Sequence, residues 1–251
     1  MKKFFLTLLA AATVFGMVSC NKNVKPADTT TDPSTEASVE PEEAIITIDG
    51  EFEDWAKLKD VVTASVSDDE ETYPYLLTMK AIADKEYIYF YFEYEIAEDQ
   101  TKVAFDLLVD ADNDPETGFS LWFFKDCGWE YCYESSDGFL AGGKFKSMNN
   151  AMTLYKCEGP DKADRWAQGS QTKTLSTSGT KSKGIVSEGI AIFELSLKRE
   201  KMQIDGKTIA VGVYTTNIIY DEATDKSTWV ENGVLPREDG VASELLEIKL
   251  P

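Results

Sequence analysis

The sequence of 251 residues contains no histidine. This absence excludes Ser-His-Asp and Cys-His nucleophile systems, zinc sites built on imidazole ligands and haem held by histidine. An enzymatic mechanism in this chain would have to use carboxylates, tyrosine or lysine. Enzymes built on a carboxylate pair exist, but no such pair can be assigned from the sequence. We therefore expect a protein that is not an enzyme.

Basic residues are also scarce. Lysine and arginine together number 25 against 45 acidic residues, which gives a formal net charge of −20. A surface of this charge repels phosphate backbones, so we expect no nucleic-acid partner. Clustered acids instead favour the binding of hard cations such as Ca²⁺.

Long hydrophobic runs are missing beyond the amino terminus. The only such run, Phe4 to Val18, spans 15 residues and follows the basic start Met1-Lys2-Lys3. Because a membrane-spanning helix needs about 20 apolar residues, this run is too short to cross a bilayer. We interpret it as a cleavable export signal.

The export signal ends at a cysteine. Val18-Ser19-Cys20 places small residues directly before the thiol, and residues 1–20 resemble a bacterial lipoprotein signal peptide. Met17 departs from the leucine or isoleucine usual in such signals. The resemblance implies that Cys20 becomes the first mature residue and carries the lipid. It implies an exported bacterial lipoprotein whose one membrane attachment, to the outer membrane, is this lipid; the face of the membrane stays open. The alternative is an ordinary secretory signal with an incidental cysteine.

Three cysteines follow the signal, Cys127, Cys132 and Cys157. An exported compartment permits disulfides, but an odd number leaves at least one thiol outside any pair. The sequence does not choose among the three pairings.

Residues 21–43 contain no aromatic side chain and are rich in Thr, Ser, Pro and acids. Such a segment cannot bury enough surface to fold, so we expect a flexible linker that spans roughly 25–30 Å. Residues 44–251 then form a single domain.

This domain contains many short β-rich runs broken by Gly, Asn, Asp and Ser, with helical turns expected only at 53–58 and 198–203. The pattern predicts an all-β fold, an antiparallel two-sheet sandwich. The expected strands are Tyr87–Tyr94, Val103–Val109, Leu121–Phe124, Trp129–Tyr133, Met152–Tyr155, Ile190–Leu195, Ile209–Tyr214 and Leu245–Leu250.

Four stretches in order resemble the family 9 carbohydrate-binding modules. They are Ile48–Trp55, Lys80–Tyr91, the strand and acidic turn Val109–Gly118, and the weaker match Gly128–Tyr131, which together cover about half of the domain. The resemblance implies a jelly-roll-like sandwich, structural calcium, and sugar binding through tryptophans that stack on a pyranose ring. Trp55 belongs to the opening motif, where we expect core packing.

Three aspartates alternate at the end of one expected strand, Asp110, Asp112 and Asp114. Acids at this spacing repel one another unless the chain turns or a cation intervenes. An EF-hand is excluded, because its sixth position is Pro115 and its twelfth is Leu121. We expect these aspartates to hold one structural Ca²⁺. A solvated turn and a catalytic role are the alternatives.

Trp166 and Trp229 are flanked by polar residues, which is typical of exposed loops where an indole could stack on a sugar. Trp129 is a third candidate, although Tyr131 and Tyr133 alternate with it as along a strand face. Core or edge packing is the alternative for all three.

The sequence therefore predicts a lipid-anchored, non-catalytic module of the cell envelope that binds a polysaccharide. Its expected setting is beside glycan-degrading enzymes or transporters. Two alternatives remain: a structural or protein-interaction lipoprotein without a sugar site, and a carboxylate-dependent glycan hydrolase or lyase.

Overall fold

The computed structural model describes residues 44–66, 75–96, 102–121, 124, 127–135, 138–149, 152–163, 172–176, 179–204, 206–239 and 241–251. One compact unit, Glu43–Pro251, contains all of them. The signal segment, Cys20, the linker and Trp166 lie outside the described residues. None of the described helices is long and apolar enough to cross a membrane.

The first layer is a five-stranded sheet in the order β1-β2-β3-β11-β10. All its neighbouring strands pair antiparallel. The strands are β1 Val62–Ser65, β2 Leu76–Ala83, β3 Tyr87–Glu95, β10 Lys181–Ser187 and β11 Ile190–Lys198.

The second layer is a nine-stranded sheet in which β13-β12-β4-β5-β8-β9 form the main path. β16 pairs with β12, β6 pairs with β4, and β7 pairs with β6. A separate two-stranded ladder joins β14 Arg237–Glu238 to β15 Val241–Ala242. The strands of the large sheet are β4 Lys102–Asp110, β5 Tyr131–Glu134, β6 Leu140–Ala141, β7 Lys144–Phe145, β8 Thr153–Cys157, β9 Thr172–Leu175, β12 Thr208–Asp221, β13 Lys226–Leu235 and β16 Leu246–Lys249.

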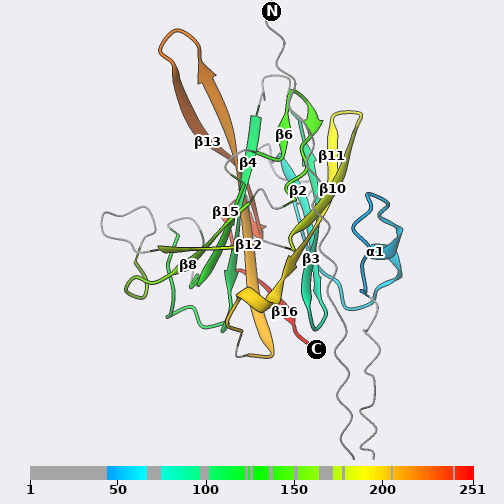
Figure 1. Ribbon diagram of the computed structural model, residues 1–251, viewed down its shortest axis with the longest axis vertical. Coiled ribbons are helices and arrows are strands. Elements are labelled where there is room, and N and C mark those ends of the chain that lie inside the picture. Colours follow the sequence, from blue (N-terminus) through cyan, green and yellow to red (C-terminus); the bar gives the residue numbers. More distant parts are fainter. Residues whose placement is uncertain are drawn as a thin grey trace, which may run out of the picture. The chain divides into compact units, whose positions relative to one another are not determined.

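The two sheets form two layers (Figure 1), and the main hydrophobic core is built from side chains of both. Val103, Phe105 and Leu107 of β4 point inward, and they share this core with Phe92 of β3 and Phe193 of β11. The rings of Phe92 and Phe193 stack with centroids 4.9 Å apart. Alternate residues of each strand thus face the core, and the predicted antiparallel two-sheet sandwich is confirmed.

The chain before β1 covers the outer face of the five-stranded sheet. The short helix α1, Glu53–Lys57, buries Trp55 in a cluster with Ile46, Tyr89 and Tyr91. Core packing of Trp55 is therefore confirmed. The 3-10 turn η1, Arg199–Lys201, ends β11 where a helical turn was expected.

The β12–β13 hairpin extends beyond the sandwich, as the orange ribbon in Figure 1 shows. β12 pairs with β4 as far as Asn217, whereas its pairing with β13 continues to Asp221. Large apolar side chains on this extension are exposed, among them Ile219, Tyr220 and Trp229.

Candidate functional site

A pocket of about 350 Å³ lies on the outer face of the nine-stranded sheet, at the base of the β12–β13 hairpin. Four strands line it, because residues that are paired across an antiparallel sheet point to the same face. The register pairs Tyr214 with Asp106, Asp106 with Glu134, and Thr216 with both Ala104 and Glu231. The lining residues are Ala104, Phe105, Asp106, Glu134, Tyr214, Thr216, Trp229 and Glu231.

Trp229 is the one large apolar side chain of this pocket that is exposed among the described lining residues. This residue is 55% exposed on β13 opposite Ile218, whereas Tyr214 of the same pocket is buried. An exposed indole leaves a flat apolar face in contact with water. A ligand that stacks on this face removes the apolar surface from water, which favours binding.

Three carboxylates, Asp106, Glu134 and Glu231, line the same pocket, and among the described residues no lysine or arginine lines it. Asp106 is buried in the sheet face. Burial also raises the pKa of Glu231. Carboxylates accept hydrogen bonds from hydroxyl groups, and charge makes these bonds stronger than neutral ones. The pocket therefore combines one stacking face with several acceptors.

A neighbouring part of this sheet face is covered by a second hydrophobic cluster. Trp129 packs there at 0% exposure with Phe119, Leu121 and Cys127, and its ring meets Phe119 edge-on with centroids 5.3 Å apart. A buried indole cannot stack on a ligand. The predicted carbohydrate contact of Trp129 is therefore wrong, and this residue belongs to the core.

A second group of acids lies at the end of β4. Carboxylate oxygens of Asp110, Asp112 and Glu130 all lie within 4.8 Å of one another. Asp110 is only 3% exposed. Its burial, followed by the charge of Glu130, raises its pKa to about 7. Burial raises the pKa of Glu130 to about 6. Three close, partly buried carboxylates repel one another unless protons or a cation reduce their charge.

Asp114 does not belong to this group of acids. Its side chain accepts a hydrogen bond of 3.0 Å from the backbone N–H of Glu116, which closes a local turn. Glu130 takes its place from across the sheet and accepts a bond of 2.7 Å from the N–H of Ala111. The hydroxyl of Thr117 lies 3.1 Å from Asp112 Oδ1 and 3.2 Å from Glu130 Oε1.

The cysteines gather near the same sheet face. Cys127 and Cys132 are buried in the cluster around Trp129, and Cys157 packs at its edge. No disulfide links these three cysteines in the structure. Burial raises the pKa of Cys127 to about 12, which keeps that thiol protonated and unreactive.

Comparison with known proteins gives matches among solved structures. No protein-family model matches the chain, and no curated protein matches it. A family 9 carbohydrate-binding module from Caldicellulosiruptor kristjanssonii, solved with cellotriose, aligns at 11% identity and a TM-score of 0.37, covering 82% of this chain and 89% of that one. A second structure from the same organism, solved with glucose, aligns at 12% identity and a TM-score of 0.36, covering 82% of this chain and 91% of that one. These are modules of the family that the sequence motifs resemble.

Several residues of the Trp229 pocket and of the acidic group at the end of β4 could not be found from the sequence. Asp106 and Glu134 look like ordinary strand residues, and the cross-strand register alone places them beside Trp229. Glu130 lies within the weak match Gly128–Tyr131, which was the one signal that could have indicated it.

Proposed function

We propose that this protein is a lipid-anchored, non-catalytic glycan-binding module of the cell envelope. The observation that carries the proposal is Trp229, which stands half-exposed at a pocket lined by Asp106, Glu134 and Glu231. A pyranose ring has an apolar face and a rim of hydroxyl groups. An indole matches the face and carboxylates match the rim, which is the combination that this pocket offers.

The charge of the pocket restricts the kind of glycan. Its carboxylates and the net charge of −20 oppose the approach of acidic chains. Neutral or weakly charged polysaccharides meet no such repulsion. We therefore expect a neutral glycan, captured near the membrane by a domain that residues 21–43 hold at a distance from the lipid on Cys20. Glycan-degrading enzymes or transporters are the expected neighbours.

One observation favours a second candidate, a carboxylate-dependent glycan hydrolase or lyase. Asp106 and Glu134 face each other across β4 and β5 beside Glu231, so acids do converge on the Trp229 pocket. A glycosidase needs one protonated and one ionised carboxyl group on either side of the scissile bond. Release of reducing ends from a bound glycan would replace the binding proposal with this one.

A glycan array with the purified protein is the first experiment, followed by titration with cellotriose and glucose. Trp229→Ala should weaken binding about fivefold or more, because stacking contributes on the order of 1 kcal/mol beyond area burial, and about 1.4 kcal/mol corresponds to tenfold. Its melting temperature should stay nearly unchanged. The matched control is Ile219→Ala, which changes an exposed residue of the same hairpin that pairs opposite Thr228 rather than lining the pocket.

Three results would contradict the proposal. A blank array for the natural protein would favour the structural or protein-interaction lipoprotein. Equal losses of binding in Trp229→Ala and Ile219→Ala would show that the hairpin's shape matters rather than the indole. Unchanged binding in Trp229→Ala would place the glycan elsewhere.

We also propose that the acids after β4 hold one structural Ca²⁺. Oxygen donors are the ligands that Ca²⁺ prefers, and Asp110, Asp112 and Glu130 bring theirs within 4.8 Å of one another. The donor set therefore fits the ion. Bound there, Ca²⁺ would neutralise the repulsion among these carboxylates and tie the β4 loop to Glu130.

Melting curves in chelator and in excess Ca²⁺ test this site. A ligand that binds only the folded state at a hundredfold excess over Kd adds about 2.7 kcal/mol of stability. Asp112→Asn should remove the difference between the two curves. Glu116→Gln, an exposed acid of the same loop outside the group, should keep it. Identical curves for the natural protein would leave these acids as a solvated turn.

A further inference from the structure

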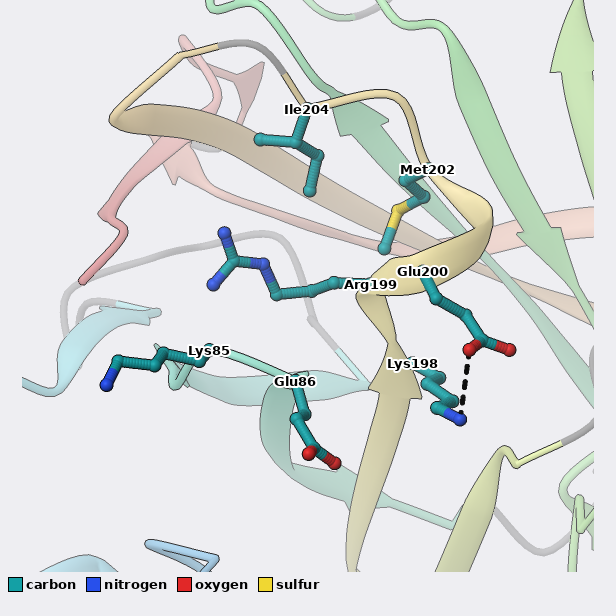
Figure 2. Close-up of a pocket in the computed structure, with 7 residues that line it drawn as sticks. All are labelled: Lys85, Glu86, Lys198, Arg199, Glu200, Met202 and Ile204. Carbon is teal, nitrogen blue, oxygen red and sulfur yellow. Dashed lines mark ion pairs between the residues drawn. The ribbon is translucent and has the colours of Figure 1, made fainter. Parts of the chain in front are cut away.

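A second pocket, of about 400 Å³, lies where the turn between β2 and β3 meets the end of β11 (Figure 2). Its volume is in the range of small-ligand sites, roughly 300–1,000 Å³. In a chain of net charge −20, three of the seven lining residues are cations. The lining residues are Lys85, Glu86, Lys198, Arg199, Glu200, Met202 and Ile204.

Arg199 is the residue that indicates a ligand. Its backbone N–H donates to the carbonyl of Glu86 at 2.8 Å, which fixes the start of η1 against the β2–β3 turn. Its side chain makes one hydrogen bond within the described part of the chain, from Nη1 to the backbone carbonyl of Asp84. A guanidinium has five N–H donors, so most of them remain for another partner. Burial lowers the pKa of Arg199, since the group has lost part of its water.

Two neighbouring acids, Asp84 and Glu200, are engaged elsewhere. The carboxylate of Asp84 accepts hydrogen bonds from the N–H groups of Glu86 at 2.8 Å and Tyr87 at 2.7 Å, and from the Tyr89 hydroxyl at 2.7 Å. Glu200 pairs with Lys198 at 3.1 Å and with Lys201 at 3.3 Å. Figure 2 shows that the guanidinium extends away from the Lys198–Glu200 pair, toward the side where Lys85 and Ile204 lie.

We propose that this pocket binds a small hydroxylated carboxylate of the sugar-acid kind. A planar carboxylate matches the guanidinium fork through two parallel hydrogen bonds, and Lys85 adds a second positive charge. Met202 and Ile204 supply an apolar wall for the carbon skeleton. Glu86 at the same pocket disfavours doubly charged phosphate and can accept hydroxyl hydrogen bonds. The proposal does not depend on glycan binding at the Trp229 pocket. The carboxylates that line that pocket repel sugar acids.

Isothermal titration of the purified protein with D-glucuronate tests this inference. D-glucose, which lacks the carboxylate, and inorganic phosphate are the comparison ligands. Arg199→Gln should weaken glucuronate binding tenfold or more, and Arg199→Lys should restore only part of it, since a lysine keeps the charge without the fork. Lys201→Gln is the matched control, because it removes one positive charge from η1 outside the pocket. Lys85→Gln gives a second test if Arg199→Gln fails to fold.

Titration with methyl glucuronoside distinguishes a free sugar acid from a uronate residue of a glycan. This compound keeps the carboxylate, and its reducing end is blocked as it is within a glycan chain. Binding of both forms indicates a uronate residue of a glycan, and binding of the unblocked form alone indicates a free sugar acid. Failure of both to bind at millimolar concentration overturns the proposal. Tighter binding of phosphate or glucose, or equal losses in Arg199→Gln and Lys201→Gln, also overturn it. Loss of glucuronate binding in Trp229→Ala would assign the acid to the other pocket.

Discussion

Glu194, in the middle of β11, is fully buried with its charge directed at three N–H donors. The backbone N–H groups of Asp49 and Gly50 donate to its Oε1 at 2.8 and 2.7 Å, and Trp55 Nε1 donates to its Oε2 at 3.3 Å. Burial raises its pKa, and these three bonds act against that rise. This one carboxylate joins the segment before β1 to the five-stranded sheet.

Glu194→Gln should lower the free energy of unfolding by about 1–3 kcal/mol, because the amide turns a donor toward one of the three N–H groups and leaves it unsatisfied. Urea denaturation of both proteins measures the change. Glu51→Gln, on the exposed surface of the same region, is the control and should be neutral. Equal midpoints for Glu194→Gln and the natural protein would show that the acid does not hold this segment.

Tryptophans show what local sequence can and cannot decide at the residue scale. Trp55 was assigned to the core from its motif, and it packs there. Trp229 and Trp129 were both candidates for ligand contact, yet Trp229 is exposed and Trp129 is buried in a cluster with Phe119 and Phe124. The difference depends on which loop crosses the sheet face, and this is a tertiary property that neighbouring residues do not encode.

At the scale of the element, the end of β4 makes stability depend on pH. The unfolded chain releases the protons of Asp110 and Glu130 near 3.8 and 4.5, whereas the folded chain keeps them until about 7 and about 6. Between these limits the folded state binds more protons, so stability falls as the pH rises. In chelator, the urea midpoint should be lower at pH 7.5 than at pH 5, and Asp110→Asn should flatten this dependence. A midpoint that rises with pH equally in both proteins would contradict the assignment.

The β4 loop also shows which parts of the acidic site the strand pattern of the sequence can predict. The apolar run Val103–Val109 located β4 within one residue at each end and placed Asp110 and Asp112 at the end of the strand. The exchange of Asp114 for Glu130 could not be predicted, because a turn bond holds Asp114 and Glu130 arrives from the segment before β5. Residue spacing informs only on a single chain segment, whereas the ligands of a metal site come from several segments.

At the scale of the whole molecule, membrane attachment should depend on Cys20 alone. Cys20→Ala should leave an unlipidated precursor that does not partition with membranes, because no later segment of the sequence is apolar for long enough to cross one. Fatty-acid labelling and membrane fractionation measure this. A labelled, membrane-bound mature protein from Cys20→Ala would show that the anchor lies elsewhere.

The sandwich itself could be predicted, since many β runs without alternating helices leave few other ways to bury their apolar faces. The division into a five-stranded and a nine-stranded sheet could not. Strand order places β11 beside β3 and β12 beside β4, and such distant pairings leave no trace in local propensity. The length of β12, 14 residues, likewise exceeds the expected run from Ile209 to Tyr214.

The extension of the β12–β13 hairpin has a consequence for local opening. Beyond Asn217, β12 pairs with β13 alone in the described part of the chain, and a two-stranded ribbon is at best marginally stable in water. Its amide protons should therefore exchange with solvent faster than those of β4, through opening events that leave the sandwich folded. A ligand stacked on Trp229, near the base of the ribbon, would stabilise the paired form of the ribbon and make its opening rarer. Mass-spectrometric hydrogen exchange should then show slowed exchange in the hairpin on ligand addition, with β4 unchanged.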